Sequence, residues 1–121
     1  MIIGSVSARH EATIRLPVLD TNGQQREMAA IIDTGFSGSL TLPPDVIATL
    51  GLPWRRRGDV LLADGSEAQF DIYAATIIWD GDFRNILIEA ADTDPLVGMA
   101  LLLGFEVNFR VVEAGSVVIT K

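Results

Sequence analysis

Apolar residues recur at every second position in several stretches of this chain, and this alternation constrains the fold more than any other feature. Between Ala12 and Val18 the even-numbered positions are apolar, and Phe105, Val107, Phe109 and Val111 alternate in the same way near the end of the chain. Successive side chains of a β-strand point to opposite faces, so the pattern is typical of strands with one buried face. The chain is therefore predicted to be mainly β.

Turn signals separate the predicted strands. Asn22-Gly23 indicates a two-residue hairpin turn, and a second strand returns through Met28 to Asp33. A long strand, turned at 79–82, is followed by a returning strand at 83–90, and a last strand is expected at 116–120. One face of the long strand carries a set of mostly apolar residues: Phe70, Ile72, Ala74, Thr76 and Ile78.

Two short helices interrupt the strands. Pro44 suits a helix start, and Gly51 can end a helix over Pro44–Leu50. A second helix is expected over Met99–Leu103, closed by Gly104. Short strands with two brief helices predict a closed or nearly closed all-β barrel, with residues 1–121 forming one domain.

Composition and charge narrow the classes of function. The chain has 121 residues, 49% of them hydrophobic, so it can build a core. It has no cysteine, which excludes disulfides, thiolate zinc sites and cysteine nucleophiles and is compatible with the cytoplasm, where we expect the protein. The formal charge of −7 opposes binding to nucleic acids. No segment approaches the roughly 18 apolar residues of a membrane span, and the first four residues lack the basic region of a signal peptide.

Asp33-Thr34-Gly35 is the first candidate for chemistry. It stands where a buried strand ends, a place from which side chains can be aimed into a cleft, and Gly35 permits backbone shapes that other residues resist. The hydroxyl of Ser37 can hydrogen-bond a nearby carboxylate. The alternative is that the tripeptide is merely a turn.

Leu96-Val97-Gly98 is the second candidate, and the apolar run Met99–Leu103 follows it. Taken alone, this segment is read more simply as a buried strand that passes into a buried helix.

In this order and at this separation, the two segments resemble the retropepsin-like aspartic proteases. The string from Asp33 to Gly38 resembles the small bacterial and archaeal members with Asp-Thr-Gly-Phe. The resemblance implies that a hairpin precedes the triplet, that a flap hairpin has its tip at residues 63–66, and that Leu96-Val97-Gly98 packs behind the catalytic loop.

The resemblance also implies roles for residues. Asp33 is expected to be the catalytic acid or base and Thr34 to brace two catalytic loops across a twofold axis, while Gly35 gives the loop its shape. Residues expected on the substrate side are Ser37, Ala63, Asp64, Gly65 and Val97. The chain departs from retroviral members at Phe36, where they usually have alanine, and at Met99 and Ala100, where they have arginine and Asn or Asp. The retroviral interlocking of chain ends is therefore in doubt here.

The chain carries a single Asp-Thr-Gly triplet, whereas peptide hydrolysis by this route needs two carboxylates and a water. One ionised carboxylate takes a proton from the water, and the other, protonated, donates to the scissile carbonyl. Two carboxylates about 3 Å apart share one proton. The second must come from another chain, so a homodimer acting on extended peptides is predicted, with no metal or cofactor.

Two other functions stay open: a peptide-binding or dimerisation module that keeps the fold without turnover, and a β-barrel ligand binder. Other residues give weaker evidence of function. His10 has no evident nucleophile partner, and Arg55-Arg56-Arg57 is typical of a solvated face. Asp92 and Asp94 are too few for a calcium-binding loop, and Trp79 is expected to cap the core.

Overall fold

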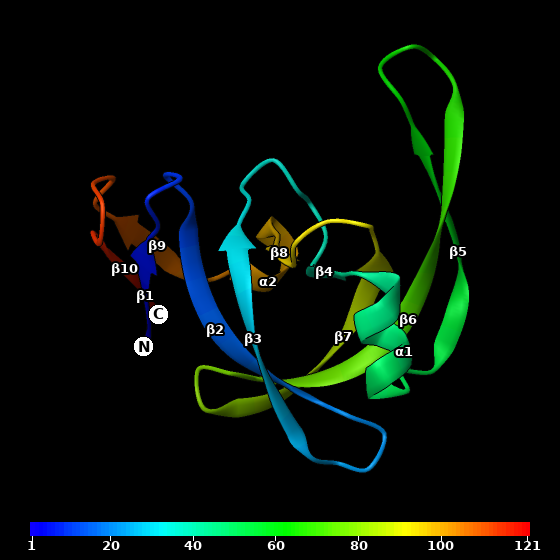
Figure 1. Cartoon of the computed structure of the whole chain (residues 1–121), viewed down its shortest axis with the longest axis horizontal. Coiled ribbons are helices and arrows are strands. Elements are labelled where there is room, and N and C mark those ends of the chain that lie inside the picture. Colours follow the sequence, from blue (N-terminus) through cyan, green and yellow to red (C-terminus); the bar gives the residue numbers. More distant parts are fainter.

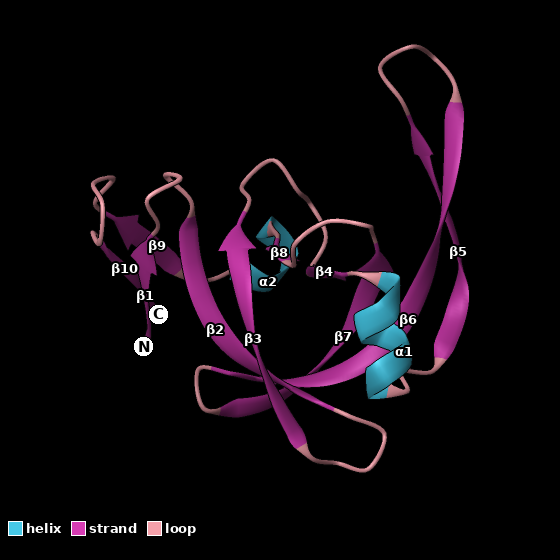
Figure 2. Ribbon diagram, viewed as in Figure 1, coloured by secondary structure: helices cyan, strands magenta, loops and turns pink.

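A computed structural model describes residues 1–121 and contains ten strands and two short helices (Figures 1 and 2). Strands make up most of the regular structure, which confirms the predicted all-β class. In chain order the elements are β1 (Ile2–Val6), β2 (Ala12–Leu19), β3 (Gln25–Ile32), β4 (Leu40–Leu42), α1 (Pro44–Leu50), β5 (Trp54–Leu61), β6 (Glu67–Trp79), β7 (Asp82–Ala90), β8 (Leu96–Val97), α2 (Met99–Leu102), β9 (Glu106–Phe109) and β10 (Ser116–Thr120).

All ten strands belong to one sheet, in the order β5-β6-β7-β4-β8-β3-β2-β1-β10-β9. A further pairing of β6 with β2, where Ile77 lies opposite Val18, closes the strands from β6 to β2 into a ring. β1, β10 and β9 extend the sheet beyond β2, and β5 extends it beyond β6. This partly closed ring matches the predicted barrel.

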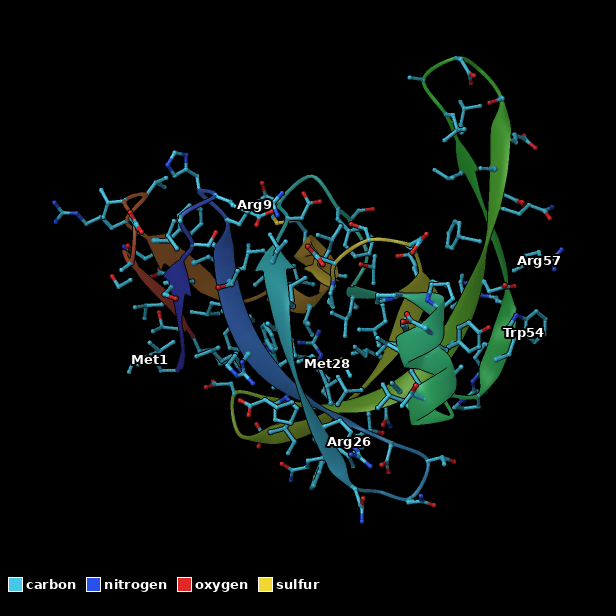
Figure 3. All side chains as sticks on the ribbon, in the orientation of Figure 1. Met1, Arg9, Arg26, Met28, Trp54 and Arg57 are labelled. Atoms are coloured by element: carbon cyan, nitrogen blue, oxygen red, sulfur yellow. The ribbon has the colours of Figure 1, made fainter.

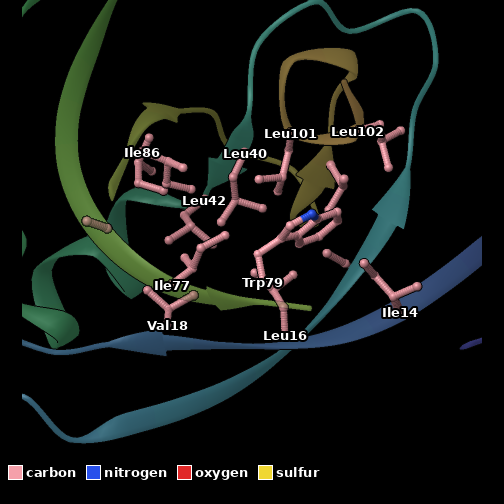
Figure 4. Packing of buried hydrophobic residues seen from close by; sticks show 14 of the residues in the cluster. Ile14, Leu16, Val18, Leu40, Leu42, Ile77, Trp79, Ile86, Leu101 and Leu102 are labelled. Carbon is pink, nitrogen blue, oxygen red and sulfur yellow. The ribbon is translucent and has the colours of Figure 1, made fainter. Parts of the chain in front are cut away.

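The ring encloses one hydrophobic core of 20 buried residues. Figure 4 shows Ile14 and Leu16 of β2 on one side of this core and Leu40 of β4 on another. Trp79 is 3% exposed and meets the ring of Phe105 edge-on, with ring centroids 5.9 Å apart. Trp79 is therefore a core residue, and burial of large aromatic surface stabilises the closed end of β6.

The long strand β6 uses its two faces for different purposes. The even-numbered residues of β6 do share one face, as predicted. The core, however, lies on the opposite face, where Ala75, Ile77 and Trp79 are buried. On the predicted face, Ile72 is buried outside the core cluster, and Phe70 lies nearby and is partly buried. Because the outer half of β6 leaves the ring to form a hairpin with β5, its even-numbered side chains face a separate hollow.

The first hairpin turns over more residues than the expected two. Leu19 pairs with Gln25, and Asp20 and Gln24 are joined by a further backbone hydrogen bond of 2.9 Å. The carboxylate of Asp20 accepts the backbone N–H groups of Asn22 and Gln24, both at 2.9 Å, so this aspartate selects the wider loop. The pKa of Asp20 is lowered, first by the bond from Gln24.

The helices follow the prediction closely. α1 has the predicted bounds and ends at Gly51, whose φ of 68° lies in the left-handed region. α2 ends one residue early, at Leu102. β9 ends at Phe109, so Val111 lies in the turn before β10 instead of in the strand.

Both chain ends are paired inside the chain. β1 runs antiparallel to β10, with Ile2 opposite Ile119, so the two termini lie side by side in Figure 1. Neither helix is long and apolar enough to cross a membrane.

Candidate active site

Asp33 directly follows β3 and is fixed by the short parallel pairing of β3 with β8. Ile31 pairs with Leu96 and Ile32 with Val97, and the N–H of Asp33 then donates to the carbonyl of Val97 at 2.9 Å. The main chain at Asp33 is thus held by the strand behind it. This is the arrangement expected for Leu96-Val97-Gly98, which passes from a strand into α2.

A tight turn shapes the chain around the carboxylate. Oδ1 of Asp33 accepts the N–H of Gly35 at 2.9 Å, and the carbonyl of Asp33 accepts the N–H of Phe36 at 3.1 Å. Thr34 and Gly35 are exposed, so both are available to a second chain. Ser37 is also exposed, and the donor to the Asp33 carboxylate is the backbone of Gly35 instead of the Ser37 hydroxyl.

Gly98 lets the loop of residues 33–39, here called the catalytic loop because Asp33 is the candidate catalytic residue, lie directly against the start of α2. A Cβ at this position would lie 2.2 Å from the carbonyl oxygen of Gly38 and 2.5 Å from the ring of Phe36. Three hydrogen bonds join the two segments: Gly98 N–H to the Ser39 carbonyl, Met99 N–H to that of Phe36 and Ala100 N–H to that of Gly38, at 2.9, 2.8 and 3.1 Å. Glycine is therefore required at position 98 by close approach of backbones.

Two side chains, Thr41 and Arg84, hydrogen-bond to the segment that supports the catalytic loop. The hydroxyl of Thr41, a buried polar group, accepts the N–H of Leu96 at 3.0 Å. The guanidinium of Arg84 donates to the carbonyls of Ala100 and Leu101, at 3.2 and 3.1 Å, and so satisfies carbonyls of α2 that lack a helical partner. Neither residue was expected from the sequence, since each acts through a contact distant in the chain.

Val97 does not belong to a substrate surface, which corrects the expectation for this residue. Its side chain is fully buried in the core cluster, and its contribution to the site is the carbonyl that fixes Asp33. A side chain with no exposed surface cannot contact a peptide.

The β5–β6 hairpin projects from the ring, and its tip lies where the flap was expected (Figure 1). The N–H of Gly65 donates to the carbonyl of Leu62 at 2.9 Å, and Gly65 has a φ of 86°, which a side chain would strain. Asp64 closes the tip by accepting the hydroxyl and the N–H of Ser66, which lower its pKa in that order. Ala63 is exposed.

The three consecutive arginines of β5 do not form one basic patch. Arg57 bonds Gln69 and pairs with Asp71 at 3.6 Å, and it lies with Trp54 on the outer side of the hairpin in Figure 3. Arg56 points to the other face and lines the hollow beside the catalytic loop, whereas Arg55 lines a different hollow. Strand alternation separates Arg56 from Arg57, and the register shift between Trp54 and Arg56 separates Arg55 from Arg57, so the run is dispersed.

The hollow beside the catalytic loop, here called the flap pocket, has a volume of about 370 Å³. Its walls come from the catalytic loop, the hairpin, β7 and α2: Gly38, Ser39, Arg56, Gly58, Asp59, Phe70, Ile72, Leu87, Glu89 and Ala100. The sequence reasoning missed Glu89, although its register opposite Ile72 places it on the same sheet face. A larger hollow of about 610 Å³ lies at the β2–β3 turn and α1 end, lined by none of residues 33–39.

No cluster of three or more metal-binding side chains exists in the structure. Asp92 and Asp94 lie in the bend before β8 and have no third acidic neighbour there that could complete such a cluster.

Comparison with known proteins shows the fold. No family model and no curated sequence matches this chain. The crystal structure of a retropepsin-like aspartic protease from Rickettsia conorii matches with a TM-score of 0.59, over 98% of this chain and 87% of that chain, at 21% identity. The chain therefore has the retropepsin-like fold, and the resemblance read from its sequence is confirmed at that level.

Proposed function

We propose that this chain is an aspartic endopeptidase whose active site forms at the twofold axis of a homodimer. The observation that carries the proposal is the placement of Asp33: a partly exposed carboxylate at a strand end, supported through Val97 and Gly98, in a loop whose Gly38 and Ser39 line a pocket shared with the projecting hairpin. Retropepsin-like geometry in the Rickettsia protein, which is described as an aspartic protease, supports the same function.

The chemistry follows from pairing two copies of Asp33. One carboxylate, ionised, removes a proton from a water molecule, and the water oxygen attacks the scissile carbonyl carbon. The other, protonated, donates its proton to the carbonyl oxygen, giving a tetrahedral diol that breaks down as the nitrogen is protonated. Because two carboxylates at about 3 Å share one proton, identical residues supply both an acid and a base.

Other residues are assigned supporting roles under this proposal. Thr34 braces the two loops across the axis, and Gly35 holds the Asp33 carboxylate through its N–H. Ala63, Asp64 and Gly65 form the flap tip, which closes over an extended peptide and excludes water from the dyad.

Cleavage of a mixed peptide pool by the wild-type protein and by Asp33→Asn tests the proposal, with a pepstatin-like inhibitor as a second control. Sedimentation measured on the same samples gives the oligomeric state. Cleavage that depends on Asp33, is blocked by the inhibitor and increases per chain with protein concentration is the expected result. A dimer that binds peptides without cutting them would instead establish a non-catalytic module.

A further inference from the structure

The flap pocket contains a carboxylate without a partner. Glu89, on β7, lies partly buried and forms no ion pair or hydrogen bond within the chain. Its Oε2 occupies the space beside Gly38, where a Cβ would lie only 2.1 Å away. The missing side chain at position 38 therefore gives the carboxylate its place at the wall shared with the catalytic loop.

The neighbours of Glu89 compensate its charge only in part. Arg56 and Ile72 occupy the same cross-strand row, since Arg56 pairs with Ile72 and Ile72 with Glu89, so all three face the pocket. Arg56 lowers the pKa of Glu89 by its charge, but burial raises it more strongly. With Asp59 also on the wall, the pocket holds two carboxylates and one guanidinium.

The remaining walls suit a long aliphatic stem. Phe70, Ile72 and Leu87 are apolar, and Gly58 lacks the side chain that would collide with the Phe70 ring at 2.6 Å. Lysine and arginine side chains combine such a stem with a cationic end. A cation inside the pocket would form a charge-assisted hydrogen bond with a carboxylate that is already partly removed from water.

We infer that Glu89 makes the flap pocket a subsite for a lysine or arginine side chain of the peptide, near the bond that is cut. The inference rests on the proposed function for its substrate, and it adds a specificity-determining residue. Replacing the basic side chain by norleucine, which keeps the stem and loses the charge, should lower kcat/KM by about tenfold or more. An acidic side chain should be disfavoured further, because like charges would meet in a confined space.

The test compares matched peptides that carry lysine, norleucine or glutamate at each position around one cleaved bond. The wild-type protein should prefer lysine at one position. Glu89→Gln should abolish this preference while still cutting the norleucine peptide, Glu89→Asp should retain part of it, and Glu67→Gln, an exposed charge change on the same hairpin, should leave it intact.

Peptide binding to Asp33→Asn, with and without Glu89→Gln, measured by fluorescence anisotropy, separates this inference from the proposed function. Loss of the lysine preference with Glu89→Gln supports the inference even if the wild-type protein cuts nothing. Cleavage with the same preference in wild-type and Glu89→Gln proteins overturns the inference and leaves the proposed function standing. Absence of any preference for a basic side chain, in binding and in cleavage, overturns it as well.

Discussion

Gly98→Ala tests whether the segment behind the catalytic loop sets the position of Asp33. The added Cβ would lie 2.2 Å from the Gly38 carbonyl oxygen, whereas ordinary contacts begin at 3.4 Å, so the loop must retreat by about 1 Å. Three backbone hydrogen bonds cross this contact. Overpacking of about 1–3 kcal/mol, with weakening of one or two of these bonds at about 1 kcal/mol each, predicts a loss of about 2–5 kcal/mol of unfolding free energy.

For a chain of this length, that loss lowers the melting temperature by roughly 8–20 °C, which calorimetry measures directly. The same displacement should lower kcat about 100-fold at temperatures where the variant is folded, because a shift of about 1 Å disturbs a catalytic geometry by that order. Gly81→Ala is the control: it has no atom within 4 Å of the new Cβ and a φ of 84°, so only about 1 kcal/mol of backbone strain is expected. A Gly98→Ala protein with wild-type stability and activity would refute the reasoning.

Four further results are expected. Asp33→Asn should reduce cleavage to background, but the mutant dimer should be at least as tight as the wild-type dimer at pH 7, since two amides avoid the repulsion between two carboxylates. A far weaker mutant dimer, measured by sedimentation, would show that the two Asp33 side chains do not face each other. Gly65→Val should lower the cleavage rate strongly and the melting temperature only slightly, because valine strains a turn that lies at the exposed tip of the hairpin. Equal cleavage rates for the variant and the wild type would place the flap elsewhere. The pH–activity profile should be bell-shaped, because only the singly protonated pair of Asp33 carboxylates is competent. A rate that rises steadily into alkaline pH would exclude the two-carboxylate mechanism. Burial raises the pKa of Glu89, so ionisation of this group destabilises the fold as pH rises through its folded pKa. Glu89→Gln should therefore increase the unfolding free energy by less than about 1 kcal/mol at pH 7 and leave it unchanged near pH 4, as thermal melts at both pH values would show.

The sequence was informative where a local rule decides the structure. Pro44 and Gly51 bounded α1 because helix ends are set by nearby backbone chemistry. Alternation located β2 and β6, and the triplet at Asp33 was placed at a strand end because turn residues follow an apolar run.

Features that depend on distant contacts were not predictable in the same way. β1 and β4 are short, and their pairing partners lie elsewhere in the chain, so no local pattern marked them. Which face of β6 meets the core is decided by the ring closure at Ile77, not by the strand itself. Val97 was expected on the substrate side, but its position in the short strand β8 turns its side chain into the core.

The internal pairing of the chain ends has a thermodynamic consequence for assembly. Since β10 finds its partner in β1 of the same chain, the terminal strands need no second copy to complete their hydrogen bonds. The protomer can therefore reach its folded state before it meets a partner, and folding and association become separate equilibria. If two protomers assemble as proposed, dilution would separate them and lower the unfolding temperature only as far as that of the folded protomer, whereas the unfolding temperature of a dimer whose subunits fold only together keeps falling with dilution.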